Sequence, residues 1–103
     1  MFCAGVLRQV DTQLESRAAV PPEVLFSRIG DDAVLLNLVS ETYFGLDEVG
    51  TDMWQAMVQS PSLREARQRL MQQYDVEAAQ LDEDLRGLVG ELIEHGLLRL
   101  VPR

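Results

Sequence analysis

The pattern of apolar and polar positions along the chain changes its period at Asp47. Before Asp47, short apolar runs separated by turn residues predict strands at 25–29, 33–39 and 43–46. After it, apolar residues recur at helical spacing and predict helices at 48–58, from Ser62 onward, and at 78–95. We therefore expect an α+β domain in which a three-stranded antiparallel sheet is followed by three helices.

The second and third predicted strands differ in character. Residues 33–39 are apolar except for Asn37, which indicates a strand covered on both faces and central in its sheet. The third strand is short and contains Gly45, and a glycine within a strand often marks close approach of another backbone. We expect this strand at the sheet edge. Tyr43 and Phe44 point to opposite faces of it, so one of these aromatic rings leaves the core side.

The helices carry clear start and stop signals. Asp47 is a good N-cap for the first helix, and Ser62 with Glu65 forms a capping box for the second. Gly96 is placed as the left-handed stop of the third helix. Residues 97–101 then form either a short closing strand or an extended tail. This order of strands and helices is winged helix-turn-helix-like.

Buried helix faces follow from the same spacing. Trp54, with its methionine neighbours Met53 and Met57, is expected in the core and not in a ligand box, and Val49 belongs to the same apolar face. The second helix buries a stripe of four residues. The third helix carries an apolar arc, a surface wide enough to contact two different partners at once. The stripe is Leu63, Ala66, Leu70 and Tyr74, and the arc is Leu81, Leu85, Leu88, Val89, Leu92 and Ile93.

A chain of 103 residues has room for one small domain. We interpret 1–16 as an N-terminal tail or arm, because it is without sustained periodicity, and 17–103 as the domain. The apolar opening is too short and too soon broken by Arg8 to be a secretory signal, and no apolar run is long enough to span a membrane. The expected compartment is therefore the cytoplasm, and Cys3, which has no internal disulfide partner, is compatible with a reducing environment.

The net charge of −8 argues against nucleic acid and anionic lipid as partners. It is compatible with a cationic or mixed-charge peptide. On the last predicted helix, Arg86 is outnumbered by acidic residues, which is the wrong sign for a nucleic-acid-binding helix.

Catalytic groups are scarce. Cys3 lies in the predicted tail and His95 at a helix end, where it interacts with the helix dipole, so a cysteine–histidine pair is not expected. Neither Asp31-Asp32 nor 82–84 makes a convincing metal or acid–base site, because adjacent residues of a helix project about 100° apart. The sequence therefore predicts a protein that is not an enzyme and binds no metal or organic cofactor.

Four segments in order carry a resemblance to a known family: "TYFGL", "DEVGTDMW", "YDVEAAQLDEDL" and "LIEHGLL". Over 24–101 the chain resembles the PqqD-like family of small domains that bind leader peptides in the biosynthesis of ribosomally made, modified peptides. The family includes stand-alone leader-binding proteins of lasso peptide pathways. The departure is Asp47, where asparagine is more usual in the family, and aspartate caps a helix about as well.

The resemblance implies the same fold and a mechanism of β-strand addition. The leader would add as a fourth, antiparallel strand along 43–46, with backbone hydrogen bonds providing affinity. Its side chains would enter a groove beside the last helix, over an apolar floor, while Asp84 meets a polar or basic group. The implied peptide-binding residues are Thr42, Tyr43, Phe44, Gly45, Leu46, Leu81, Asp84, Leu85 and Leu88, of which Leu81, Leu85 and Leu88 form the floor.

The implied role is that of a non-catalytic peptide chaperone, which binds the precursor peptide and delivers it to a partner enzyme. In the family that partner is a radical SAM protein, a leader peptidase or another modifying enzyme. Two alternatives stay open at this point. One is a winged-helix module of the transcription type, and the other is a purely structural or dimerisation subunit.

Overall fold

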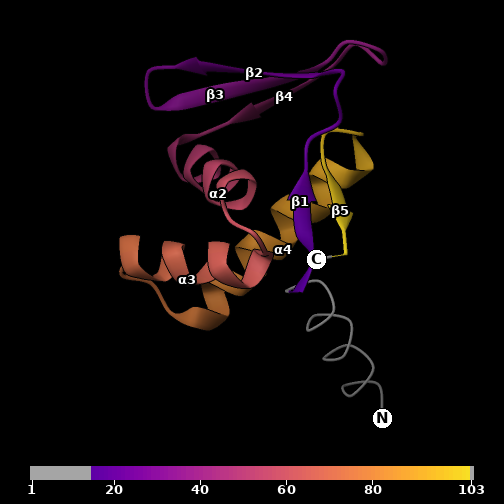
Figure 1. Ribbon diagram of the computed structural model, residues 1–103. Coiled ribbons are helices and arrows are strands. Elements are labelled where there is room, and N and C mark those ends of the chain that lie inside the picture. Colours follow the sequence, from indigo (N-terminus) through magenta and orange to yellow (C-terminus); the bar gives the residue numbers. More distant parts are fainter. Residues whose placement is uncertain (1–14, 103) are drawn as a thin grey trace.

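The computed structural model describes residues 15–102 of the chain. An antiparallel three-stranded sheet in the order β2-β3-β4 forms one side of the molecule, and the helices lie against one face of this sheet (Figure 1). A separate two-stranded antiparallel pair, β1 with β5, lies beside them. The elements are β1 (Arg17–Ala19), β2 (Val24–Ile29), β3 (Asp32–Asn37), β4 (Thr42–Leu46), α2 (Glu48–Gln59), α3 (Leu63–Gln73), α4 (Ala78–Glu94) and β5 (Arg99–Val101).

The predicted α+β order of three strands and three helices is confirmed, and β1 is added to it. The strand formed by 17–19 was not predicted, because three residues are too few to show a period and two of them are alanines. Its register pairs Ala18 with Leu100. Of the two alternatives for residues 97–101, the short closing strand is therefore the one that forms.

Asn37 ends β3 two residues earlier than the apolar pattern predicts. Its side-chain oxygen accepts hydrogen bonds from the backbone N–H groups of Val39 and Ser40, at 2.9 and 3.0 Å. These bonds fold the backbone into a turn, so it leaves the strand. The side-chain nitrogen donates to the carbonyl of Gly96, 2.9 Å away, and thereby ties this turn to the end of α4.

The outer face of β3 also differs from the prediction. The strand is central, but only its inner face, with Ala33 and Leu35, is fully buried. On the outer face Val34 and Leu36 are half-buried. They are flanked by neighbouring strands, and no helix of the described chain covers them (Figure 1). The prediction of a central strand from this apolar run is confirmed, whereas the prediction that both faces of the strand are covered is wrong.

The helices pack an apolar core against the inner face of the sheet. Trp54, Met53 and Met57 are buried as predicted, and the Trp54 ring stacks on Phe26 of β2 with centroids 6.2 Å apart. Val49, by contrast, is 42% exposed, because it lies in the first turn of α2 beyond the edge of the core. Gly96 ends α4 with a φ of 72°, the left-handed conformation that the sequence predicted.

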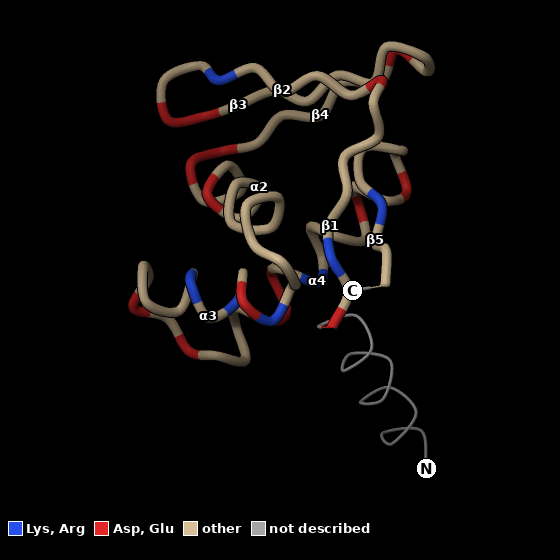
Figure 2. Tube along the Cα trace, viewed as in Figure 1, with Lys and Arg blue, Asp and Glu red and all other residues tan. Residues whose placement is uncertain are grey.

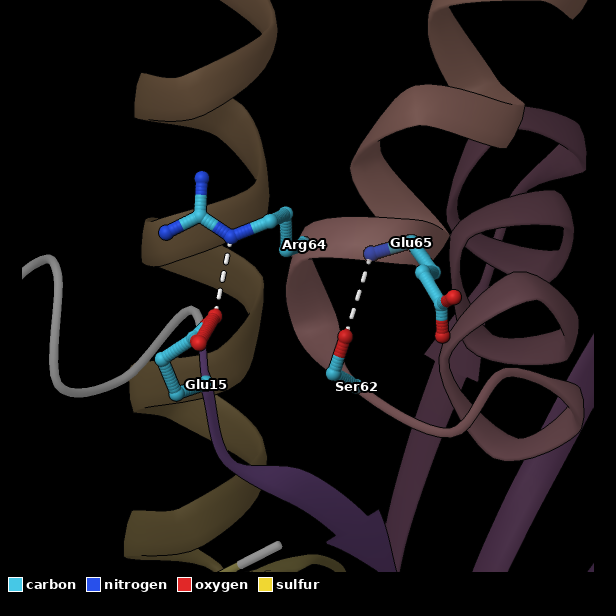
Figure 3. A network of polar contacts seen from close by, with 4 residues as sticks. All are labelled: Glu15, Ser62, Arg64 and Glu65. Carbon is cyan, nitrogen blue, oxygen red and sulfur yellow. Dashed lines mark hydrogen bonds and ion pairs between the residues drawn. The ribbon is translucent and has the colours of Figure 1, made fainter.

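The described N-terminal residues pack on the start of α3 (Figure 3). Glu15 pairs with Arg64 at 2.9 Å, and the Ser16 carbonyl accepts the Leu63 N–H at 2.9 Å. Ser62 caps α3 by accepting from the Glu65 N–H at 3.3 Å. The reciprocal bond of the predicted capping box does not form in the described chain, where one carboxylate oxygen of Glu65 is buried without a hydrogen-bond partner.

Two expectations fall on residues outside the described range. These are the assignment of the first residues to a tail and the placement of Cys3 within it. The boundary at residue 17 stays a prediction, although β1 begins there. Within 15–102, no helix is long and apolar enough to cross a membrane.

Candidate functional site

An open groove of about 590 Å³ lies between the end of β4 and α4. The strand and the start of α2 form one wall, and two turns of α4 form the other. The lining residues of the first wall are Phe44, Gly45, Leu46, Asp47 and Gly50, and those of the second are Glu83, Asp84, Gly87, Leu88 and Glu91.

The strand beside this groove has an unpaired edge in the described chain. Within residues 15–102, β4 pairs with β3 alone, so its other side presents backbone N–H and C=O groups without a strand partner. Tyr43 is 72% exposed, whereas Phe44 packs partly against the core, as expected for residues on opposite faces. The Phe44 ring also contacts His95, with ring centroids 5.7 Å apart.

The structure brings some predicted binding residues together and separates others. Phe44, Gly45 and Leu46 meet Asp84 and Leu88 at the groove. Thr42 and Tyr43 lie on β4 but outside the groove lining. Leu81 and Leu85 are only 3% and 4% exposed, belong to the hydrophobic core and do not line the groove. Their role in binding stays a prediction.

Five groove residues were not among those expected from the sequence: Asp47, Gly50, Glu83, Gly87 and Glu91. A signal for the last three exists. On a helix that buries Leu81 and Leu85, residues 83, 87 and 91 follow each other at intervals of four and therefore share one face. What the pattern does not say is that this face lies opposite β4.

The rim of the groove is acidic. Four of its lining residues are carboxylates, and none is basic. Figure 2 shows part of this charge where β4 passes into α2. Asp47 is engaged as the N-cap of α2, accepting from the Gly50 N–H at 2.8 Å, and Asp84 accepts from Gln80 at 3.0 Å.

The remaining two rim carboxylates, Glu83 and Glu91, make no side-chain hydrogen bond or ion pair within residues 15–102, and both are exposed. Asp82, which precedes Glu83 in the sequence, pairs with Arg67 of α3. The groove therefore offers the apolar side chains of Phe44, Leu46 and Leu88, an available strand edge and two negative charges without a partner in the described chain.

Comparison with known proteins identifies the family of the chain. A family model described as coenzyme PQQ synthesis protein D (PqqD) matches residues 32–98, which contain both walls of the groove. The chain belongs to the PqqD family. No curated protein matches it.

Two solved structures share the fold of this PqqD-family chain. One is TbiB1 in complex with the TbiA(beta) leader peptide, with 31% sequence identity and a TM-score of 0.72, covering 78% of this chain and 93% of TbiB1. The other is lasso peptide synthetase B1 complexed with the leader peptide, with 25% identity and a TM-score of 0.72. That match covers 81% of this chain and 98% of the other.

The remaining polar groups of this PqqD-family chain serve the fold. Tyr74 donates a hydrogen bond from its hydroxyl to Asp52, which joins the end of α3 to α2 and raises the pKa of Tyr74 to about 12. His95 lies at the C-cap of α4, with Nδ1 2.8 Å from the Glu91 carbonyl, as its predicted helix-end role requires. Within 15–102, no group of three potential ligands is arranged to hold a metal ion.

Proposed function

We propose that this protein binds the leader segment of a ribosomally synthesised precursor peptide by strand addition to β4. The observation that carries the proposal is a strand edge that is unpaired within the described chain and lies beside an open groove of about 590 Å³. An extended peptide paired with β4 forms backbone hydrogen bonds on one side and directs alternate side chains into the groove. Both structural relatives are leader-peptide complexes, which supports the same ligand class here.

In this proposal the protein performs no chemistry and acts by holding its ligand. Binding both a precursor peptide and an enzyme raises the local concentration of substrate at that enzyme. The partner would be a radical SAM protein, a leader peptidase or another modifying enzyme, working in the cytoplasm, where the precursor is made. The similarity to lasso peptide synthetase B1 favours a lasso peptide pathway.

The alternative of a nucleic-acid-binding winged helix has no support in the charge distribution. On α4, Arg86 stands among Glu83, Asp84, Glu91 and Glu94, all of them exposed. Such a surface repels a phosphate backbone.

The direct test is calorimetric titration of the full chain with the leader of the precursor encoded nearest to its gene. Asp84→Ala and Leu88→Asp should both weaken binding, because both side chains line the groove without being deep core. Leu85→Asp is unsuitable for this purpose, since it places a charge in the core and unfolds the domain. A thermal melt of each variant confirms that the fold is intact. An unchanged dissociation constant in both folded variants would place the binding surface elsewhere.

Strand addition itself is tested by methylating the leader backbone one nitrogen at a time. An extended peptide pairs with β4 through the N–H groups of alternate residues, so the loss of affinity should recur with a period of two. A helical ligand uses every interior N–H group for its own hydrogen bonds, so methylation would then weaken binding at consecutive residues, and that result would overturn strand addition.

A further inference from the structure

The charges of the groove rim have a spacing that specifies more than a preference for cations. Glu83 and Glu91 are eight residues apart on α4, which places them about 12 Å apart along the helix axis at 1.5 Å per residue. In an extended peptide, residues four apart are separated by about 13 Å and point to the same side. An extended ligand lying along α4 therefore presents the side chains of residues i and i+4 to these two carboxylates.

Gly87 lies midway between them on the same helix face. A Cβ built on this glycine would meet no atom within 4 Å, so the groove is open at this point. Leu88 and Phe44 supply apolar surface nearby in the same lining. The ligand residue between the two that face Glu83 and Glu91 therefore meets an apolar notch.

We propose that the groove selects leader peptides with a basic side chain at positions i and i+4 and a bulky apolar side chain at i+2. Glu83 and Glu91 receive the two cations, and the notch at Gly87 receives the apolar group. Lysine and arginine suit the rim because their aliphatic stems cover apolar surface while the charged head reaches the carboxylates. This inference rests on the proposed function and adds to it the class of leader sequence.

Asp47 and Asp84 are assigned a lesser part. The carboxylate of Asp47 faces the N-terminus of α2 and is satisfied by the Gly50 N–H, and that of Asp84 accepts from Gln80. Both keep their negative charge and strengthen the field of the groove. Of the four carboxylates that line the groove, only Glu83 and Glu91 accept no hydrogen bond through their side chains within residues 15–102.

The experiment selects peptides from a random display library of 12-residue sequences on the full chain and on the double variant Glu83→Gln/Glu91→Gln. The wild-type protein should enrich basic residues at i and i+4 around an apolar i+2, and the double variant should lose the basic preference. The matched control is Glu94→Gln, which removes an exposed charge of α4 outside the groove and should select as the wild type does.

A selected peptide then serves in titrations at an ionic strength of about 0.01 M, where charges act over roughly 30 Å. The double variant should bind it about tenfold more weakly, as expected for the loss of two exposed pairs. The Glu91→Lys variant should also bind this peptide more weakly than the wild type does. Its affinity should recover with a peptide in which the lysine that faces position 91 is changed to glutamate.

The outcomes separate the two proposals. Enrichment without basic residues, or equal affinity for the wild type and the double variant, would overturn the charge rule while leaving strand addition intact. Absence of binding by both selected peptides and the encoded leader would overturn the proposed function itself.

Discussion

Two glycines of α4 occupy helix-interior positions that differ only in their surroundings. Gly87 lines the groove and Gly90 does not, and a Cβ at either position would meet no atom within 4 Å. Neither glycine is required by packing, and each costs the helix roughly 1 kcal/mol relative to alanine. In the proposed function, the missing side chain at Gly87 leaves the groove open to the ligand.

Substitution of the two glycines by leucine distinguishes access from stability. Gly87→Leu and Gly90→Leu should each raise the free energy of unfolding by about 0.5–1 kcal/mol, because leucine has the higher helix propensity. Only Gly87→Leu should weaken leader binding, by about tenfold or more, since its side chain fills the groove. Urea denaturation and calorimetric titration provide the two readouts. Equal loss of binding in both variants would contradict the assignment.

Tyr74 makes stability depend on pH at high pH. Its pKa rises from 10.0 to about 12, chiefly because its hydroxyl donates a hydrogen bond to Asp52. A folded-state pKa above the unfolded value means that the contribution is complete below pH 10 and is lost as the pH rises toward about 12.

Tyr74→Phe should therefore lower the free energy of unfolding by about 1 kcal/mol at neutral pH. The variant should also lack the fall in the free energy of unfolding that ionisation of Tyr74 causes between pH 10 and about 12. Urea denaturation across that range provides the measurement. Tyr43→Phe is the control, because that exposed ring makes no such bond in the described chain and the decline should persist. An identical pH dependence in all three proteins would exclude the Asp52 bond as its cause.

At the scale of elements, β1 and β5 form a pair that does not line the groove. The pair joins the beginning of the described chain to its end, and β1 also contacts α2. Ala18 is 5% exposed at the centre of this pairing. The pairing thereby holds the two ends of the described chain together and against α2.

Ala18→Asp should destabilise the whole domain by at least about 2 kcal/mol, because it buries a charge without a partner. Arg17→Asp, one residue away on the exposed side of β1, should change stability much less. Both are measured by urea denaturation. Similar stability of the two variants would mean that β1 contributes little to the fold.

At the scale of the whole molecule, the charge of the chain and the groups at the groove suit the binding of a peptide. The chain has a net charge of −8. Its groove combines apolar side chains with carboxylates and lies beside a strand edge, which suits a peptide. The groups assembled at the groove are carboxylates, glycines and apolar side chains, and none is placed as a nucleophile beside a base.

The purified protein should therefore leave its precursor peptide unchanged, while its omission should slow the partner enzyme. The slowing should appear mainly as a higher KM, since the protein raises the local substrate concentration. Mass spectrometry of the precursor and steady-state kinetics of the enzyme measure the two effects. Cleavage or modification of the precursor by this protein alone would refute the chaperone role.

The sequence by itself determined the order of the elements, their caps and much of the core. Asp47, Ser62 and Gly96 act through bonds to residues a few positions away, and helical spacing identified the burial of Trp54. Such signals are local, so they survive without knowledge of the fold. The short, glycine-containing β4 was likewise recognisable as an edge strand.

Only the tertiary structure decided which face of α4 meets β4. Leu85 and Leu88 are equivalent as apolar residues of one helix, yet packing buries the first and places the second in the groove. Only the tertiary structure likewise ties the turn after β3 to the end of α4, through the bond from Asn37 to Gly96 across 59 positions. Helix rotation and long-range bonds are set by how complete elements pack together, and no local period records that choice.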